Sequence, residues 1–209
     1  MIKLTKKYKS GTALEIMQEA ILFGDIPAGI RITQTELAAS LDVSRMPVRE
    51  ALIALEYQGL VRRHTNQHVE ITALTNDGIH EIFSDMASLE TETIRGLADK
   101  DSALLSSFKD QREFHRELCG MAGSAFRRKT LETFAGVYLA FVLNNSEDTG
   151  RIDAVFGNIL EAVKNPDDKE ILRAGYAVYS EVLANEFIRI RRKREKDAER
   201  QAGKAAASA

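Results

Sequence analysis

Two features that would identify a partner or a compartment are scarce in this chain of 209 residues. It has one cysteine, Cys119, which excludes an intramolecular disulfide and a zinc site built from cysteines. A single thiol fits a reducing compartment, and we expect it to fill core space. No apolar run approaches the roughly 18 residues of a membrane span, and the N-terminal MIKLTKKYKS lacks the apolar core of a signal peptide. We therefore expect a cytoplasmic protein with no membrane partner.

The chain also lacks an excess of charge of either sign. Its 29 Lys and Arg oppose 31 Asp and Glu, which gives a formal net charge of -2. The overall field does not attract nucleic acid, so a DNA partner must be met by a local arginine surface. With 44% hydrophobic and 29% charged residues, the chain is long enough for one large domain or two small ones, each with its own core.

The first part of the chain carries signals for two short helices. An apolar stripe predicts a helix over about 10–23, and Gly24 with the following turn residues ends it. Thr33 and Glu36 have the spacing of a capping box ahead of a second helix that runs to about Leu41. Both helices are short enough to need the support of a shared core.

A third helix over about 44–58 follows the tight connection DVS. Ser44 is a candidate N-cap whose hydroxyl would accept a backbone N–H, and Pro47 lies in the first turn, where its missing N–H has no intrahelical partner. Two short strands, 60–63 and 68–72, then flank a polar turn. The order helix, helix, tight turn, helix, hairpin is typical of a winged helix-turn-helix.

The third helix buries one side and leaves two arginines on another. Its apolar repeat consists of Val48, Ala51, Leu52 and Leu55. Arg45 and Arg49 lie four apart at the N-terminal end, which enters the major groove in helix-turn-helix proteins. A guanidinium can donate two parallel N–H groups to guanine O6 and N7, and Ser44 with the free first-turn amides suits a phosphate. The alternative is that the arginines pair with surface carboxylates such as Glu50 or Glu56.

Beyond about Thr75 the apolar pattern is helical throughout. After a first helix to about residue 97, further helices are expected over 102–121, 124–145, 150–164 and 167–194. The charged and then small residues of 196–209 predict a frayed helix end and a disordered tail. The alternative for 189–194 is a basic arm that contacts DNA.

Few residues of this helical part indicate chemistry of their own. Glu90 and Glu92 lie two apart, so they point to different sides of a helix and are expected at the surface. The core or a dimer interface is expected to take five aromatic residues, which are Phe126, Phe134, Tyr138, Phe141 and Tyr176. No nucleophile stands in a recognisable elbow and no glycine loop cradles a phosphate. We therefore expect neither an enzyme nor a cofactor.

The stretch GDIPAGIRITQTELAASLDVSRMPVREALIALEYQGLVRR resembles the DNA-binding domain of the GntR transcriptional regulators, over about residues 9–72. It carries their E-L-A, V-S-R-x-P-V-R-E-A-L and L-x-x-x-G-L-V segments. In that family a wing tip enters the minor groove, and Asn66 stands here in place of the wing glycine, since asparagine tolerates a positive φ. The resemblance implies operator contacts from Thr35, Ser44, Arg45, Met46, Arg49, His64, Thr65 and Asn66.

Two later segments, IHEIFSDMASLE and EFHRELCGMAGSAF, resemble the FCD domain of the FadR-type branch, an all-helical domain for effector binding and dimerisation. Many such domains hold a divalent metal through one aspartate and three histidines. At the aligned positions this chain has Gln111, His115, Phe156 and Tyr179, and the nearest carboxylate, Asp110, is one residue out of register. Because an amide and one imidazole do not make a transition-metal site, we expect no metal. His115 is then a buried remnant or a member of an effector site.

The sequence therefore predicts a mainly α protein with a winged helix-turn-helix domain at 1–74, an all-helical effector-binding and dimerisation domain at 75–195, and a tail at 196–209. The expected function is that of a sequence-specific transcriptional regulator, by default a repressor, which binds a palindromic operator as a homodimer. A small-molecule effector would act through the helical domain. Two alternatives are a metal- or organic-acid-binding module and a constitutive DNA-binding dimer that has lost effector sensing.

Overall fold

The computed structural model describes residues 11–64, 68–164 and 168–207. These divide into two units: unit 1 holds the residues up to Thr75 together with Arg191 onward, and unit 2 holds the residues from Asn76 to Ile190. Among the described residues, none of the helices combines the length and the apolar character that crossing a bilayer requires.

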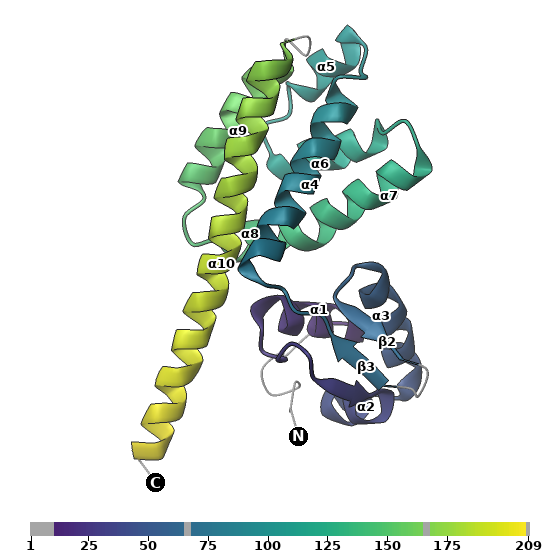
Figure 1. Ribbon diagram of the computed structural model, residues 1–209, viewed down its shortest axis with the longest axis vertical. Coiled ribbons are helices and arrows are strands. Elements are labelled where there is room, and N and C mark those ends of the chain that lie inside the picture. Colours follow the sequence, from purple (N-terminus) through teal and green to yellow (C-terminus); the bar gives the residue numbers. More distant parts are fainter. Residues whose placement is uncertain (1–10, 65–67, 165–167, 208–209) are drawn as a thin grey trace. The chain divides into compact units, whose positions relative to one another are not determined.

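Unit 1 combines short helices with a small antiparallel sheet (Figure 1). In chain order its described elements are α1 (Ala13–Phe23), β1 (Arg31–Thr33), α2 (Gln34–Leu41), α3 (Arg45–Tyr57), β2 (Val61–Arg63) and β3 (His68–Ile71). The predicted hairpin is present as β2 and β3, with Arg62 opposite Glu70. Strand β1 joins the other side of β3, with Ile32 opposite Val69. The sequence did not predict β1, because three residues are too few to show an alternating pattern.

Local side chains set the ends of α2 and the start of α3. As predicted, Thr33 and Glu36 form a capping box in which each side chain binds the other residue's backbone N–H. Asp42 ends α2 in the left-handed region with a φ of 54°. Ser44 is the N-cap of α3, as predicted, but the expected hydrogen bond from its hydroxyl is wrong, because the side chain makes no capping bond. Ser44 is exposed, so water reaches the first-turn amides that this hydroxyl was expected to cap.

The core of unit 1 lies where the helices meet the sheet. Its most deeply buried members include Met17, Leu37, Val48, Leu52, Leu55 and Leu60, each with no exposed surface. Helix α3 supplies three of these from the apolar repeat that the sequence showed. Burial of roughly this kind stabilises a domain by about 1.5–3 kcal/mol for each large aliphatic side chain. One side of α3 is therefore held in the core, and its other side is left to solvent.

The C-terminal part of the last helix also belongs to unit 1. Arg194 Nη2 donates to Asp25 Oδ2 at 3.1 Å, and its guanidinium carbon lies 4.7 Å from the centre of the Phe23 ring. Arg191 Nη1 donates to the backbone oxygen of Leu74 at 2.6 Å. These two arginines therefore bind groups of unit 1. The sequence analysis anticipated no such contact for 189–194, for which it considered a basic arm that contacts DNA.

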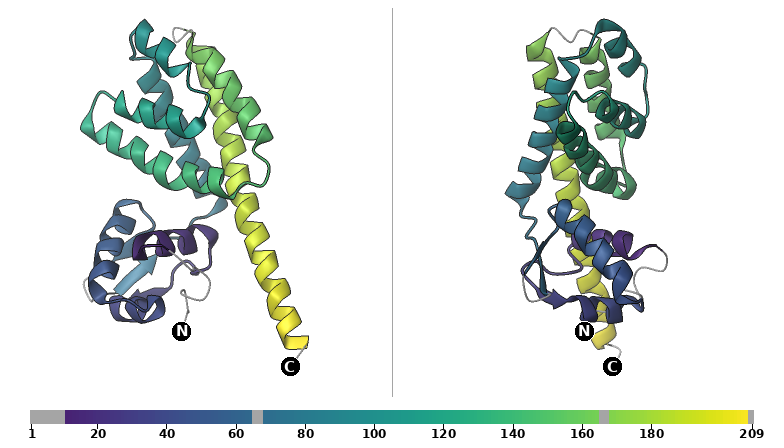
Figure 2. Two further views of the ribbon diagram at one scale, coloured as in Figure 1. Left: turned by 180° about the vertical axis from the view of Figure 1, so that it is seen from behind. Right: turned by 90° about the vertical axis from the view of Figure 1, so that its right-hand side faces the viewer.

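Unit 2 is built from helices alone in its described residues (Figure 2). They are α4 (Asn76–Ile94), α5 (Asp99–Leu105), α6 (Gln111–Gly120), α7 (Ala125–Thr133), the π-helix η1 (Phe134–Leu139), α8 (Ala140–Asn145), α9 (Gly150–Val163) and the first part of α10 (Lys169–Ala207). Helices α4 and α10 run side by side in the views of Figures 1 and 2. The unit is therefore the helical bundle that the sequence predicted.

Three boundaries in the second half of the chain differ from the sequence-based expectation. The helix predicted over 102–121 is interrupted between α5 and α6, because the Asp110 side chain accepts the Glu113 N–H at 3.0 Å and starts a new helix. The helix over 124–145 is continuous but contains the π-helix η1. Helix α10 continues to Ala207, beyond the end expected at residue 194, so the prediction of a disordered tail from residue 196 is wrong as far as residue 207.

Aromatic side chains fill much of the core of unit 2. The ring of Phe187 lies 6.2 Å from that of Phe83 and 4.6 Å from that of Phe141. Cys119 is buried, as predicted, and burial raises the pKa of its thiol to about 12. Phe126 is 82% exposed, so it does not lie in the core, and the other expected place, a dimer interface, stays a prediction. Phe126 lies in the first turn of α7, where the core does not cover it.

Candidate functional site

The outward side of α3 carries the side chains expected to meet DNA. Arg45, Met46 and Arg49 are exposed, and Met46 exposes 61% of its surface. On the opposite side Val48 and Leu52 are fully buried. Since the buried side fixes the rotation of α3 about its axis, the two arginines are presented to solvent from a rigid support.

Both arginines are free of internal ion pairs in the part of the chain that the structure describes. The expected alternative partner Glu56 instead accepts a hydrogen bond from Arg63 Nε at 2.6 Å. Glu50 makes no ion pair with a described residue either. The pairing of Arg45 and Arg49 with these carboxylates is therefore wrong, and their N–H groups are available to an outside acceptor.

Two further exposed residues extend this side of α3. Ile53 and Tyr57 follow Arg49 at intervals of four residues and expose 48% and 60% of their surfaces. The sequence analysis did not single them out, although apolar residues on the polar side of a helix were a visible signal. A base methyl group or a sugar is the kind of apolar surface that such side chains contact on DNA.

The remaining residues of the predicted DNA surface lie on α2 and on the hairpin. Thr35 is exposed in the first turn of α2. At the base of the hairpin, the Glu70 carboxylate accepts hydrogen bonds from Arg31 Nε at 3.2 Å and His64 Nε2 at 3.0 Å. These bonds hold the pKa of Glu70 below its ordinary value. The tip residues Thr65 and Asn66 lie outside the described residues.

Unit 2 contains a second cluster of polar side chains, which is buried except for Asp153. His115 Nδ1 lies 2.6 Å from Glu90 Oε1, and both side chains are only 1% exposed. His115 Nε2 lies 3.0 Å from the Tyr179 hydroxyl, which donates to Gln111 Oε1 at 2.7 Å. Gln111 Nε2 in turn donates to Asp153 Oδ1 at 2.6 Å. We call these five residues the internal polar cluster.

The Asp153 carboxylate sets the direction of this chain of hydrogen bonds. A carboxylate only accepts, so the Gln111 amide must turn its nitrogen to Asp153 and its oxygen to Tyr179. The Tyr179 proton is then committed to Gln111, and burial raises the pKa of this hydroxyl well above its ordinary value, which keeps it protonated. His115 Nε2 must therefore carry the hydrogen that it shares with the Tyr179 oxygen. A second proton lies between Nδ1 and Glu90.

The expected surface position of Glu90 is thus wrong. Seen along the sequence, Glu90 and Glu92 lie on different sides of one helix, but this does not say which side is buried. Glu90 is 1% exposed because it faces His115 of α6, and Glu92 is exposed and binds Arg95 at 2.7 Å. No signal in the sequence joined Glu90 to a histidine 25 residues away.

Four members of one neighbourhood are the residues aligned with the metal ligands of FCD domains. The His115 ring lies 6.1 Å from the Phe156 ring and stacks at 5.8 Å on the Tyr179 ring, next to Gln111. The set does not suit a metal ion, because Phe156 has no donor atom and both His115 nitrogens already have partners. In the described ranges, no group of three or more His, Cys, Asp or Glu is placed to bind a metal.

Comparison with known sequences relates the first unit to a family of regulators. Residues 9–71 match the sequence model of the family described as "Bacterial regulatory proteins, gntR family". The HTH-type transcriptional regulator YdhC of Bacillus subtilis is 34% identical over 84 residues, which are 40% of this chain and 38% of that protein. The Nta operon transcriptional regulator of Aminobacter aminovorans is 28% identical over 127 residues, 51% of this chain and 60% of that one. The chain thus spans from 38% to 60% of the length of these relatives.

Solved structures resemble this chain over most of its length. Lar, described as controlling the expression of the Listeria monocytogenes agr system, superposes with a TM-score of 0.55 at 16% identity over 85% of this chain and 95% of that one. E. coli McbR/YncC superposes with a TM-score of 0.50 at 18% identity over 93% and 100%. At these identities the likeness concerns the fold, a winged helix-turn-helix domain followed by a helical domain. Residues 9–71 therefore match the sequence model of the gntR family of bacterial regulatory proteins and fold as a winged helix-turn-helix domain.

Proposed function

We propose that this protein is a sequence-specific DNA-binding transcriptional regulator of the GntR family. The observation that carries the proposal is the pair Arg45 and Arg49, which are exposed, free of internal ion pairs with described residues, and held by a buried apolar side of α3. Arginine in this place suits guanine in the major groove. The family match and the names of the relatives as transcriptional regulators support the same conclusion.

The protein acts in this proposal as a homodimer on a palindromic operator, since a two-fold pair of recognition helices matches a two-fold DNA site. Thr35, Ser44, Met46 and the hairpin residues His64, Thr65 and Asn66 would add phosphate and groove contacts. Repression is the default mode, because a protein bound at an operator blocks access to the DNA. The work of the protein is binding, and no catalytic step is needed.

Unit 2 is proposed to be a divergent FCD-like domain of the FadR-type branch. Support comes from the contact between Gln111, His115, Phe156 and Tyr179, the four positions that aligned with the metal ligands of that domain. A small molecule that binds unit 2 better in one arrangement of the dimer would shift the population that binds the operator.

The internal polar cluster favours one alternative, a DNA-binding dimer that has lost effector sensing. Its side chains bind one another through hydrogen bonds of 2.6 to 3.0 Å, so a ligand would have to break existing bonds to enter. Glu90 Oε2 is buried and accepts no hydrogen bond from a described residue. A metal-binding module has no such support. Loss of operator binding on addition of a carboxylate or another metabolite would exclude the sensing-deficient dimer.

The proposed function is tested with duplexes selected from a random pool by the full-length protein. At one fixed salt concentration, Arg49→Ala is expected to weaken binding to the selected duplex by about 1–3 kcal/mol, or about 5- to 150-fold. Arg116→Ala, the same change at an exposed arginine of α6, is the matched control and should retain the original affinity. Unchanged binding by Arg49→Ala would overturn the groove assignment.

A further inference from the structure

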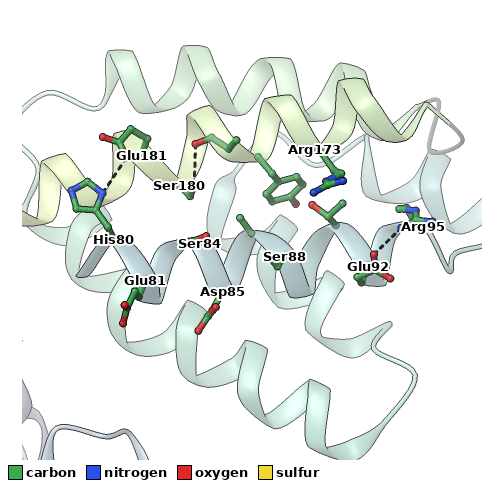
Figure 3. A pocket seen from close by; sticks show the side chains of 14 residues that line it. His80, Glu81, Ser84, Asp85, Ser88, Glu92, Arg95, Arg173, Ser180 and Glu181 are labelled. Carbon is green, nitrogen blue, oxygen red and sulfur yellow. Dashed lines mark hydrogen bonds and ion pairs between the residues drawn. The ribbon is translucent and has the colours of Figure 1, made fainter. Parts of the chain in front are cut away.

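An open groove runs between α4 and α10 of unit 2 and has a volume of about 840 Å³. Figure 3 shows its two walls, with residues of α4 along one side and residues of α10 along the other. Its middle is lined by small side chains, among them Ser84, Ser88, Ala177 and Ser180. Side chains of this size let a second helix approach closely.

The two ends of the groove carry opposite charges (Figure 3). Glu81 and Asp85 line one end, and Arg95 and Arg173 line the other. Within the described ranges Glu81, Asp85 and Arg173 make no ion pair. Arg95 binds Glu92 of its own helix at 2.7 Å. Three of these four charged side chains therefore have no oppositely charged partner among the described residues.

The contact between His80 and Glu181 leaves the two other carboxylates at the acidic end without an opposite charge in the described part of the chain. His80 Nδ1 and Glu181 Oε2 lie 3.0 Å apart across the groove at the end that holds Glu81. This contact uses Glu181 but leaves Glu81 and Asp85 exposed. The imbalance along the groove, acidic at one end and basic at the other, is thus a property of the folded unit.

The exposed residues of α4 repeat symmetrically about one position. Glu81 and Ser88 of α4 and Arg95, the residue directly after this helix, are spaced seven residues apart. The Arg95 N–H donates to the Thr91 oxygen at 3.1 Å, so the helical turn continues and all three residues follow one side of it. A helix that packs antiparallel on α4 about Ser88 places residue 81 of one copy opposite residue 95 of the other. A two-fold axis there joins opposite charges twice, because every contact between two copies occurs in both directions.

We propose that this groove is the surface through which two copies of the chain associate, with α4 antiparallel to α4 of the second copy and Ser88 at the two-fold axis. Glu81 of each copy then meets Arg95 of the other, and Arg173 adds a second cation near the same carboxylate. The inference rests on the homodimer of the proposed function and names its surface.

A second copy suits the groove better than a small molecule does. Ligand pockets are mostly apolar and enclose most of the ligand surface. This groove is open along its length and is lined mostly by serine, threonine, alanine and charged side chains, together with Tyr176 and His80. When a second copy packs antiparallel, the acidic end of each groove meets the basic end of the other, as a self-associating surface requires.

Cross-linking tests the position of the two-fold axis in the full-length protein. Ser88→Cys should form a disulfide-linked dimer under mild oxidation, because the two thiols face each other across the axis. Ser107→Cys is the matched control, an exposed serine after α5 outside the groove. Cys119 supplies no background, since its buried thiol has its pKa raised to about 12. Equal cross-linking of both variants, or none by Ser88→Cys, would overturn the proposal.

Charge reversal tests the ion pairs, with sedimentation velocity as the readout. Glu81→Arg and Arg95→Glu should each raise the dimer dissociation constant by about tenfold or more, since each places like charges opposite one another twice. The double variant restores opposite charges and should recover most of the affinity. Glu161→Arg, an exposed position on α9, should leave the dissociation constant unchanged.

The outcomes separate this surface from the proposed function. A wild-type dimer that is indifferent to both reversals contradicts the α4 surface and leaves the homodimer intact. A wild-type monomer at high concentration contradicts both the surface and the homodimer, and DNA binding by Arg49 is then judged by its own titration. Weakening by each single reversal with recovery in the double variant supports the surface, because a folding defect would not be repaired by a second reversal.

Discussion

The exposed side of α3 and the internal polar cluster of unit 2 treat polar side chains in opposite ways. Arg45 and Arg49 are exposed and make no ion pair with a described residue. Glu90 and His115 are each 1% exposed and bind one another at 2.6 Å. One region presents donors without acceptors to solvent, and the other matches donors with acceptors inside the core. The difference teaches that exposed charges can remain open to a partner, whereas buried ones must find partners within the fold.

A binding surface needs polar groups that are supported but not satisfied, so that a partner supplies the missing contacts. Helix α3 meets this condition because its buried leucines hold it while its arginines remain open. A closed hydrogen-bonded network instead rigidifies a core and resists a ligand. The comparison therefore supports the proposal that α3 recognises DNA, and it favours a structural role for the cluster around His115.

The largest change is expected from rebuilding a metal site in the cluster. Gln111→Asp, Phe156→His and Tyr179→His together supply one carboxylate and two imidazoles beside His115, whose Nδ1 already binds Glu90 as an orienting carboxylate. We expect this variant to bind Zn²⁺ or Ni²⁺ with a dissociation constant below about 10 µM, which corresponds to a binding free energy of roughly −7 kcal/mol. Isothermal titration calorimetry with elemental analysis measures it.

The control for this variant is the same triple substitution with His115→Ala, which should lose the metal. If the triple variant is folded by circular dichroism and binds no more metal than the natural protein, the four positions do not form a common site. The comparison between the exposed side of α3 and the internal polar cluster would then lose part of its structural basis.

The next largest effect is expected from removing one partner of the buried pair. His115→Ala leaves the Glu90 carboxylate without the donor that lies 2.6 Å from it. An unpaired buried charge typically destabilises a protein by about 3–5 kcal/mol. Urea unfolding followed by circular dichroism gives the change in free energy of unfolding. Replacing both residues, Glu90→Leu with His115→Leu, should recover much of the loss, and a loss below about 1 kcal/mol for His115→Ala would show that the pair is not desolvated.

The smallest effect is expected from the same type of change on α3. Arg45→Ala and Arg49→Ala remove exposed side chains with no internal ion pair to a described residue, so each should alter the free energy of unfolding by less than about 0.5 kcal/mol. The same urea titration applies. A loss as large as that of His115→Ala would mean that these arginines support the fold, and their effect on DNA binding could not be read as a lost contact.

Much of unit 1 was predictable because its signals are local. The capping pair Thr33 and Glu36, the proline in the first turn of α3 and the apolar repeat through Leu55 all lie within a few residues of the features that they define. Strand β1 was missed because it depends on pairing with β3, 37 positions along the chain at Ile32 and Val69. A contact of that range leaves no local pattern.

In unit 2 the pattern of residues showed helices but not which sides they bury. Alignment singled out His115, Phe156 and Tyr179, and the fold brought them within about 6 Å of one another. Glu90 was predicted at the surface and is buried, and Phe126, predicted in the core or in a dimer interface, lies outside the core. A single helix has more than one candidate buried side, and only its neighbours decide between them.

The sequence by itself determined most of the helices, the winged helix-turn-helix order and the two arginines on the outward side of α3, because helix caps and apolar spacing act over a few residues. Only the tertiary structure decided that Glu90 pairs with His115, that Gln111 joins Tyr179 to Asp153, and that α4 and α10 form a groove with opposite charges at its ends. Those contacts join residues that are far apart along the chain, and for Glu90 and His115 burial strengthens the bond by removing the competing water.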